Sequence, residues 1–169
     1  MSVELSKQLA ALGLHYAAEH LDDIIALATK NRWGTVETLA HLAEHEAKGR
    51  AQRSLDRRLA RSKLGRFKAM ADFDWGWPAR IDRDAVEDAL KLDFLATHRN
   101  LVLVAPQGLG KTMIAQNIAH QAVLKGHTAI FTTASQLLLD LGAQDSPRAL
   151  DRRLKHYAHA GLLVVDEVG

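Results

Sequence analysis

The residues best suited to do chemistry lie between an apolar run and a helix-like run. Residues 101–104 are apolar, residues 105–109 read APQGL, and Gly110, Lys111 and Thr112 follow. The backbone N–H groups of such a loop, with the positive end of the next helix, attract phosphate oxygens. A lysine at this spacing reaches the terminal phosphates of a nucleotide, and the neighbouring hydroxyl binds magnesium. The predicted nucleotide-contacting residues are Ala105, Pro106, Gln107, Gly108, Leu109, Gly110, Lys111, Thr112 and Met113.

One position departs from the phosphate-loop pattern G-x-x-x-x-G-K-[ST]. Ala105 stands where the first glycine belongs. The methyl group of alanine is tolerated if the residue keeps a negative φ, and it is costly if the residue needs a positive φ. The alternative to a phosphate site is a glycine-rich turn between a strand and a helix, with Lys111 solvated.

A second motif favours the phosphate site over the plain turn. Residues 162–165 form another apolar run, and Asp166 and Glu167 follow it directly. A continuous apolar run is typical of a strand buried on both faces, and ligands of open α/β sheets bind at the carboxyl ends of strands. We predict that Asp166 and Thr112 hold Mg²⁺. Glu167, which would polarise the attacking water, and Lys111 are the predicted catalytic residues.

The chain divides into three predicted regions. Residues 1–68 show helical spacing of apolar side chains, residues 69–80 hold a short aromatic stretch, and residues 81–169 alternate between helix-like and strand-like patterns. Strands alternating with helices predict a parallel sheet, so the expected fold class is α/β, a P-loop core preceded by an all-α region. We expect a helix over residues 85–95 capped by Asp84, strands at 101–104, 128–132 and 162–165, and helices directly after the loop, from about Ser135 and after Pro147.

A strongly basic segment precedes the aromatic stretch. Between Lys48 and Lys68 there are nine basic residues and one acid, Asp56. Helical spacing places most of the basic side chains along one surface, which matches the electrostatic footprint of nucleic acid, mainly its phosphates. The alternative is a solvated helix face whose long side chains cover an apolar seam. The predicted nucleic-acid-contacting residues are Arg50, Arg53, Arg57, Arg58, Arg61, Lys63 and Arg66.

The composition narrows the class of protein. There are no cysteines among the 169 residues, which excludes disulfides and thiolate metal sites. The charged start of the sequence lacks a signal-peptide core, and no run approaches the length of a membrane helix, so we expect a cytoplasmic protein without membrane contact. His41, Glu44 and His45 spell a zinc-protease pattern. No third ligand is evident, and we interpret both histidines as half-exposed side chains of an amphipathic helix.

The order of these segments resembles the IstB family. The resemblance rests on the basic helical region, the stretch Asp72-Phe73-Asp74-Trp75, the loop NLVLVAPQGLGKT and the run LLVVDEVG. IstB proteins are AAA+ ATPases that assist insertion-sequence transposition, and they are related to the bacterial helicase loader DnaC. The resemblance implies ATP and Mg²⁺ as cofactors, double-stranded DNA and the transposase of the same element as partners, homo-oligomers of the intact protein, and a bacterial, nucleoid-associated location.

The end of the sequence differs from the family pattern. Family members continue beyond the Asp-Glu pair with further strands, a sensor residue, an arginine finger and a helical lid. We therefore expect an AAA+ core that is incomplete at its C-terminus, lacks a central strand and hydrolyses little ATP alone. The resemblance places Phe73 or Trp75 near the adenine, and the alternative is that both side chains pin the linker to the core. A DnaC-like helicase loader and a non-enzymatic DNA-binding remnant stay open as functions.

Overall fold

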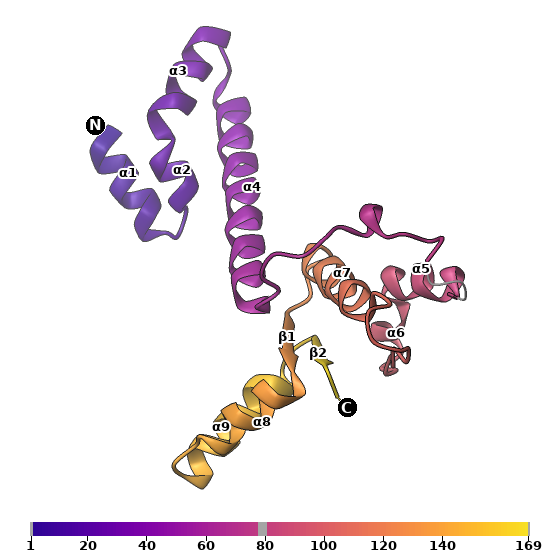
Figure 1. The fold of residues 1–169 in the computed structure, drawn as a ribbon. Coiled ribbons are helices and arrows are strands. Elements are labelled where there is room, and N and C mark those ends of the chain that lie inside the picture. Colours follow the sequence, from indigo (N-terminus) through magenta and orange to yellow (C-terminus); the bar gives the residue numbers. More distant parts are fainter. Residues whose placement is uncertain (1, 78–80, 169) are drawn as a thin grey trace. The chain divides into compact units, whose positions relative to one another are not determined.

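The structure, a computed structural model, describes residues 2–77 and 81–168, and the chain forms two compact units, residues 1–56 and 57–169. Pro78, which closes the predicted aromatic stretch, and Gly169 lie outside the described residues. Helix α4 (Thr35–Ser62) contributes residues to both units. Figure 1 shows the elements in chain order.

The first unit is wholly helical, as the sequence predicts. Besides the N-terminal part of α4, it contains α1 (Ser2–Ala11), α2 (His15–Glu19) and α3 (Leu21–Asn31). Ala17, Leu21 and Ile24 form its buried core. Helix α2 approaches α4 so closely that a Cβ atom at Gly49 would overlap the ring of Tyr16. Glycine at this position therefore permits the contact between α2 and α4.

The second unit combines helices with a small sheet. Strands β1 and β2 pair in parallel, with Ala129 opposite Leu162 and Thr133 opposite Asp166. Helices α7 and α8 each pack against both strands. This arrangement confirms the predicted mixture of parallel strands and helices. The elements after α4 are η1 (Met70–Asp72), α5 (Arg83–Lys91), α6 (Asp93–Ala96), α7 (Lys111–Leu124), β1 (Ala129–Thr133), α8 (Ala134–Gly142), α9 (Pro147–Ala158) and β2 (Leu162–Asp166).

The predicted helix over residues 85–95 is divided into α5 and α6, and the prediction that Asp84 caps it is wrong. The side chain of Asp82, not of Asp84, accepts a hydrogen bond from the Ala85 backbone N–H at 2.9 Å and caps α5. The helix ends at Lys91, and its C-cap residue Leu92 has a φ of 71° and is only 4% exposed. Burial of this side chain offsets the left-handed backbone, and α6 begins at the next residue.

Residues 101–104, predicted as a strand, pair with no other strand in the part of the chain that the structure describes. Leu103 packs against the core, whereas Val102 and Val104 are 76% and 88% exposed. An apolar run becomes a strand only where a neighbouring strand offers hydrogen-bond partners. Among the described residues, β1 and β2 pair only with each other and residues 101–104 join neither edge, so the prediction of a strand here is wrong for this structure.

Helix α7 lies at the centre of the second unit. Ile114 and Ile118 are buried on one of its faces, together with Phe73 from the aromatic stretch and Val86 from α5. Further along α7, Val123 is fully buried. Because α7 packs on the aromatic stretch, on α5 and on the sheet, its first residues are held in a fixed position relative to all three.

Candidate functional site

The glycine-containing loop ends at the N-terminus of α7. Gly108 and Gly110 have φ values of 82° and 85°, in the left-handed region that favours glycine. Gly110 is the N-cap residue of α7, so the loop leads into the positive end of that helix. Ala105 is not among the residues with a positive φ. The alanine at the departing position therefore carries no left-handed strain.

The ammonium group of Lys111 lies over the start of the loop. Its Nζ atom donates hydrogen bonds to the carbonyl oxygens of Ala105 at 2.6 Å and Pro106 at 2.8 Å. These contacts place a positive charge beside the loop that leads into the N-terminus of α7. A mobile cation beside a helix N-terminus is the arrangement that attracts phosphate.

The loop and the Asp-Glu pair meet directly. The Thr112 hydroxyl donates a hydrogen bond to Oδ2 of Asp166 at 2.7 Å, although the two residues are 54 positions apart in the sequence. Asp166 ends β2, and α7 packs against β2, so the fold itself brings them together. A hydroxyl and a carboxylate supply the oxygen ligands that Mg²⁺ prefers. The two predicted magnesium ligands therefore fit that ion.

Glu167 follows at the carboxyl end of β2. Its side chain is exposed and its φ is 55°. Its backbone N–H donates to Oδ1 of Asp166 at 3.0 Å, so both carboxylate oxygens of Asp166 are engaged. This geometry places Glu167 next to the oxygen pair of Thr112 and Asp166, with its carboxylate accessible.

Two buried residues pack next to the loop: Asn117, which sequence reasoning did not assign to the site, and Phe73. Asn117 of α7 accepts from the Met70 N–H at 2.9 Å and donates to the carbonyl oxygens of Lys68 at 2.9 Å and Met113 at 2.8 Å. Asn117 is buried, and no signal in the sequence separates it from the other polar residues of the run MIAQNIAHQAVL. Phe73 packs against Gly110, since a Cβ atom there would lie 2.6 Å from its ring.

The aromatic stretch is thus fastened to the core. The Phe73 ring meets that of Trp75 edge to face at 4.8 Å, and the guanidinium group of Arg83 lies 4.8 Å from the centre of the Trp75 ring. Phe73 is only 8% exposed. These contacts favour the interpretation that the aromatic side chains pin the linker.

Comparison with known proteins agrees with this geometry. The family described as IstB-like ATP binding protein matches residues 7–169. The chain belongs to this family. A relative from Pseudomonas aeruginosa, named as an ATP-binding protein of insertion sequence IS21, is 30% identical over 166 residues, which cover 98% of this chain and 63% of the relative. A relative from Bacillus thuringiensis subsp. berliner, named for insertion sequence IS232, is 31% identical, with 98% and 66% covered. The chain thus spans about two thirds of the length of these relatives.

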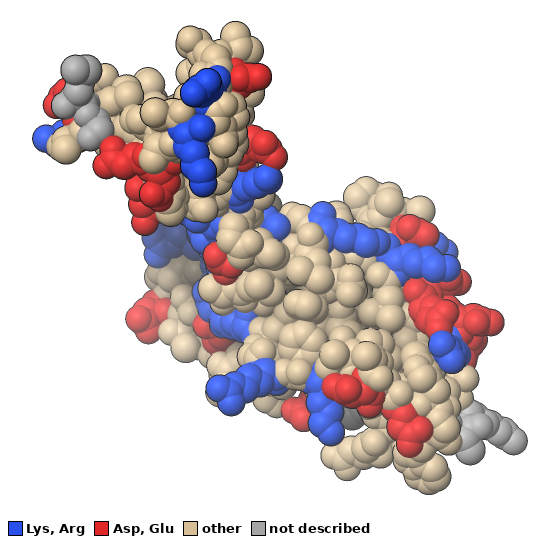
Figure 2. All heavy atoms as spheres, turned by 90° about the horizontal axis from the view of Figure 1, so that it is seen from above, with Lys and Arg blue, Asp and Glu red and all other residues tan. Residues whose placement is uncertain are grey.

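The basic side chains of this IstB-like chain fall into different environments. Arg50 and Arg53 contact the buried carboxylate of Glu46. Arg58 is half-buried, and its Nε atom donates to the Val123 carbonyl at 3.2 Å. After Asp56, the exposed basic residues of the segment are Arg57, Arg61, Lys63, Arg66 and Lys68. On the face drawn in Figure 2, basic and acidic side chains are interspersed rather than separated onto two sides.

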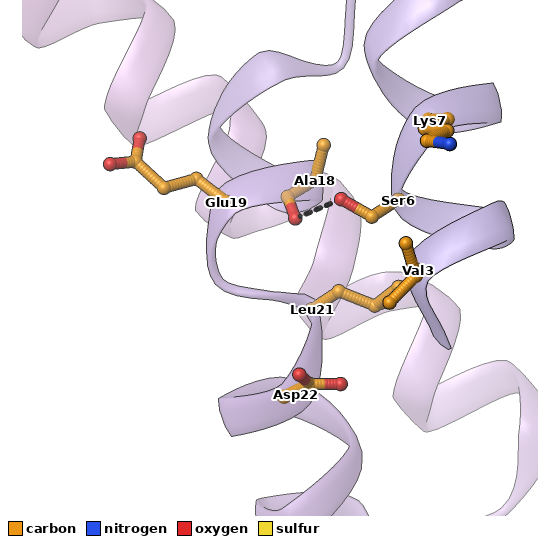
Figure 3. A pocket seen from close by; sticks show the side chains of 7 residues that line it. All are labelled: Val3, Ser6, Lys7, Ala18, Glu19, Leu21 and Asp22. Atoms are coloured by element: carbon orange, nitrogen blue, oxygen red, sulfur yellow. Dashed lines mark hydrogen bonds between the residues drawn. The ribbon is translucent and has the colours of Figure 1, made fainter. Parts of the chain in front are cut away.

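Other features of the described residues give no second site of comparable definition. A hollow of about 330 Å³ in the first unit is lined by Val3, Ser6, Lys7 and Ala18, with Glu19 and Asp22 at its rim (Figure 3). Within residues 2–77 and 81–168 there is no group of three His, Asp or Glu residues placed to hold a metal. The ring centres of His41 and His45 instead lie 4.3 Å apart, with the rings tilted by 37°. No helix in this part of the chain combines the length and apolar character needed to cross a bilayer.

Proposed function

We propose that this chain binds ATP with Mg²⁺ and contacts DNA as an accessory protein of transposition. The observation that carries the nucleotide part is the hydrogen bond between Thr112 and Asp166, because it joins the phosphate loop to the Asp-Glu pair. Membership of an ATP-binding family supports the same assignment. The names of the relatives, which refer to insertion sequences, support the link to transposition.

Each residue of the nucleotide site has a proposed role. The N–H groups of residues 105–110 and the Lys111 ammonium group would hold the phosphates, and the Thr112 hydroxyl and the Asp166 carboxylate would hold Mg²⁺. Bound magnesium would neutralise charge on the phosphate oxygens. The exposed carboxylate of Glu167 would accept a hydrogen bond from the attacking water and orient it.

ATP binding is the property that tests this proposal most directly, because it depends on the phosphate loop and on Lys111. The transposase of the same element and double-stranded DNA are the proposed partners, and the basic residues after Asp56 are the proposed DNA contacts. A bacterial nucleoid location and assembly into homo-oligomers belong to the same proposal.

Titration with a fluorescent ATP analogue tests the nucleotide site. Lys111→Ala removes charge-assisted hydrogen bonds worth about 1.5–3 kcal/mol, so the affinity should fall about tenfold to a hundredfold. Lys125→Ala is the matched control, since Lys125 follows the other end of α7 and its Nζ atom donates to the Lys91 carbonyl. Thr112→Ala should weaken binding only when magnesium is present. Equal affinities of Lys111→Ala and the unaltered chain would refute the ATP site and leave the DNA-binding remnant as the better description.

A further inference from the structure

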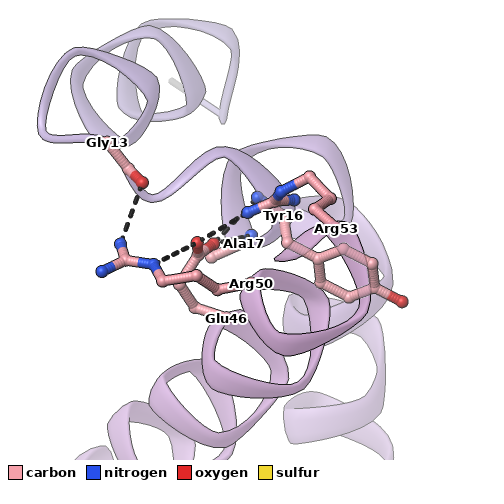
Figure 4. Close-up of polar contacts among 6 residues, drawn as sticks. All are labelled: Gly13, Tyr16, Ala17, Glu46, Arg50 and Arg53. Atoms are coloured by element: carbon pink, nitrogen blue, oxygen red, sulfur yellow. Dashed lines mark hydrogen bonds and ion pairs between the residues drawn. The ribbon is translucent and has the colours of Figure 1, made fainter. Parts of the chain in front are cut away.

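A buried carboxylate already holds two guanidinium groups of the basic segment (Figure 4). Glu46 is 3% exposed, and its Oε1 atom lies 3.0 Å from Nη2 of Arg53 and 3.6 Å from Nε of Arg50. Arg50 also donates from Nη2 to the Gly13 carbonyl at 3.2 Å. Both arginines therefore have defined partners inside the first unit.

The second oxygen of Glu46 holds the start of α2. It accepts hydrogen bonds from the backbone N–H groups of Tyr16 at 2.8 Å and Ala17 at 3.0 Å. Burial alone raises the pKa of Glu46, but the N–H groups of Ala17 and Tyr16 and the charges of Arg53 and Arg50 outweigh it, and the net pKa is lowered. A buried carboxylate that stays charged needs its cations, because removing them leaves the charge without compensation.

Residues 64–68 of the basic segment contact α7 in the second unit, rather than a buried carboxylate. The Leu64 carbonyl accepts from the Gln116 side chain at 3.4 Å, the Lys68 carbonyl accepts from Asn117 at 2.9 Å, and the Phe67 ring lies 5.2 Å from that of His120. The chain path is therefore fixed by carbonyl groups and an aromatic ring, without use of the basic head groups of this stretch other than that of Arg58.

Four basic side chains project from this fastened stretch into solvent. Within the described part of the chain, no ion pair or hydrogen bond involves the head groups of Arg57, Arg61, Arg66 and Lys68, and all four are exposed. Arg57 and Arg61 are one helical turn apart on α4, so they share a face. Lys63 differs from these, because its charge helps to lower the pKa of Asp140.

We propose that Arg57, Arg61, Arg66 and Lys68 contact the phosphates of DNA, whereas Arg50 and Arg53 are positioning residues that hold the first unit together around Glu46. This inference rests on the proposed DNA contact and divides its predicted residues into two groups with different roles. All four residues belong to the same unit as Lys111 and Thr112, and the Lys68 carbonyl is hydrogen-bonded to α7, the helix that begins with Lys111.

Two charge-matched double variants of α4 separate the roles. Arg57→Gln with Arg61→Gln, and Arg50→Gln with Arg53→Gln, each remove two positive charges, and glutamine has nearly the helix propensity of arginine. The affinity for a labelled DNA duplex is measured by fluorescence anisotropy over a series of potassium chloride concentrations. Each lost phosphate contact lowers the slope of log affinity against log salt by about 0.9. We expect the first variant to lose about 1.8 from the slope and to melt like the unaltered chain, and the second to keep the slope and melt earlier.

The opposite pattern would overturn the inference. If Arg50→Gln with Arg53→Gln lowers the slope at an unchanged melting temperature, these arginines contact phosphate and do not serve Glu46. If that double variant does not fold, the single variant Arg50→Gln replaces it, because the hydrogen bond from Arg53 to Glu46 is kept. A slope reduced by about 0.9 in this single variant would show that Arg50 contacts phosphate. If the unaltered chain shows no salt-dependent affinity for DNA, the proposed DNA contact fails. The melting temperatures then decide the role of Arg50 and Arg53 separately.

Discussion

Phe73 occupies the space in which a Cβ atom at position 110 would lie, and this makes Gly110→Ala an informative substitution. An added Cβ would lie 2.6 Å from Cε2 and 3.4 Å from Cζ of Phe73. Gly108, two residues earlier, has nearly the same φ, 82° against 85°, but a Cβ there would meet no atom within 4 Å. Gly108→Ala is therefore a control for backbone strain without the overlap.

The two substitutions should differ in the free energy of unfolding of the second unit. Placing a side chain on a left-handed residue costs about 1–2 kcal/mol, and this applies equally to both. Overlap with a well-packed core side chain adds about 1–3 kcal/mol, because Phe73 is 8% exposed and is held by Trp75. We expect losses of about 1–2 kcal/mol for Gly108→Ala and about 2–5 kcal/mol for Gly110→Ala.

Urea denaturation followed by tryptophan fluorescence measures these losses. In a Trp33→Phe background the signal comes from Trp75 and Trp77, which both belong to the second unit. Adding Phe73→Ala completes a double-mutant cycle, and removal of the ring should relieve about 1–3 kcal/mol of the Gly110→Ala penalty. Equal losses for the two alanine substitutions, or a cycle without coupling, would show that Phe73 does not lie against Gly110.

Three further predictions follow from the polar contacts. Glu46→Gln should remove an acid-sensitive part of the stability of the first unit. The contacts of Glu46 lower the pKa of its carboxyl group. The stabilisation by Glu46 is therefore complete above the ordinary pKa of about 4.3 and is lost as the pH falls through the lowered pKa. Urea midpoints reported by Trp33, with Trp75 and Trp77 replaced by phenylalanine, should fall more steeply with acid in the Glu46 protein than in the variant. Asn117→Ala should destabilise the second unit by about 2–4 kcal/mol and speed amide exchange at Met70, since that N–H loses its acceptor; a loss below about 1 kcal/mol would contradict this role. Burial and the hydrogen bond to Asp140 raise the pKa of Tyr157, so its stabilisation holds below about pH 10 and is lost as the pH rises through the raised value. In a pH titration followed by tyrosinate absorbance, the part of the change at the highest pH should be absent from Tyr157→Phe. If that part is present in the variant, the raised pKa does not belong to Tyr157.

The juxtaposition of the phosphate loop and Asp166 could be predicted because its signals are local. The loop, Lys111 and Thr112 are consecutive or nearly so, and Asp166 follows an apolar run whose burial in a sheet is readable from the sequence. Parallel pairing then forces the end of β2 toward the start of α7. That residues 101–104 form no strand was not predictable in the same way, since a strand depends on a partner and apolar character alone does not supply one.

The roles of the basic residues depend on acids that lie just outside the basic segment. The segment begins at Lys48, and Glu44 and Glu46 precede it by four and two positions. In the structure those two acids contact Lys48, Arg50 and Arg53. Moreover, Glu46 binds the N–H groups of residues 29 and 30 positions away. Contacts of that sequence separation depend on how α2 docks on α4, which no local pattern specifies.

Helix α7 connects the parts that the sequence presents as separate. Its first residues, Lys111 and Thr112, belong to the nucleotide site, and the side chain of Asn117 fixes both Lys68 and Met70. Phe73 leaves this fastened stretch and packs against Gly110 at the start of the same helix. The stretch from Lys68 to Phe73 is thus attached to α7 at two points, the side chain of Asn117 and the N-cap residue Gly110. A displacement of Gly110 toward Phe73 would require this ring to move, because a Cβ atom at position 110 would already lie 2.6 Å from it.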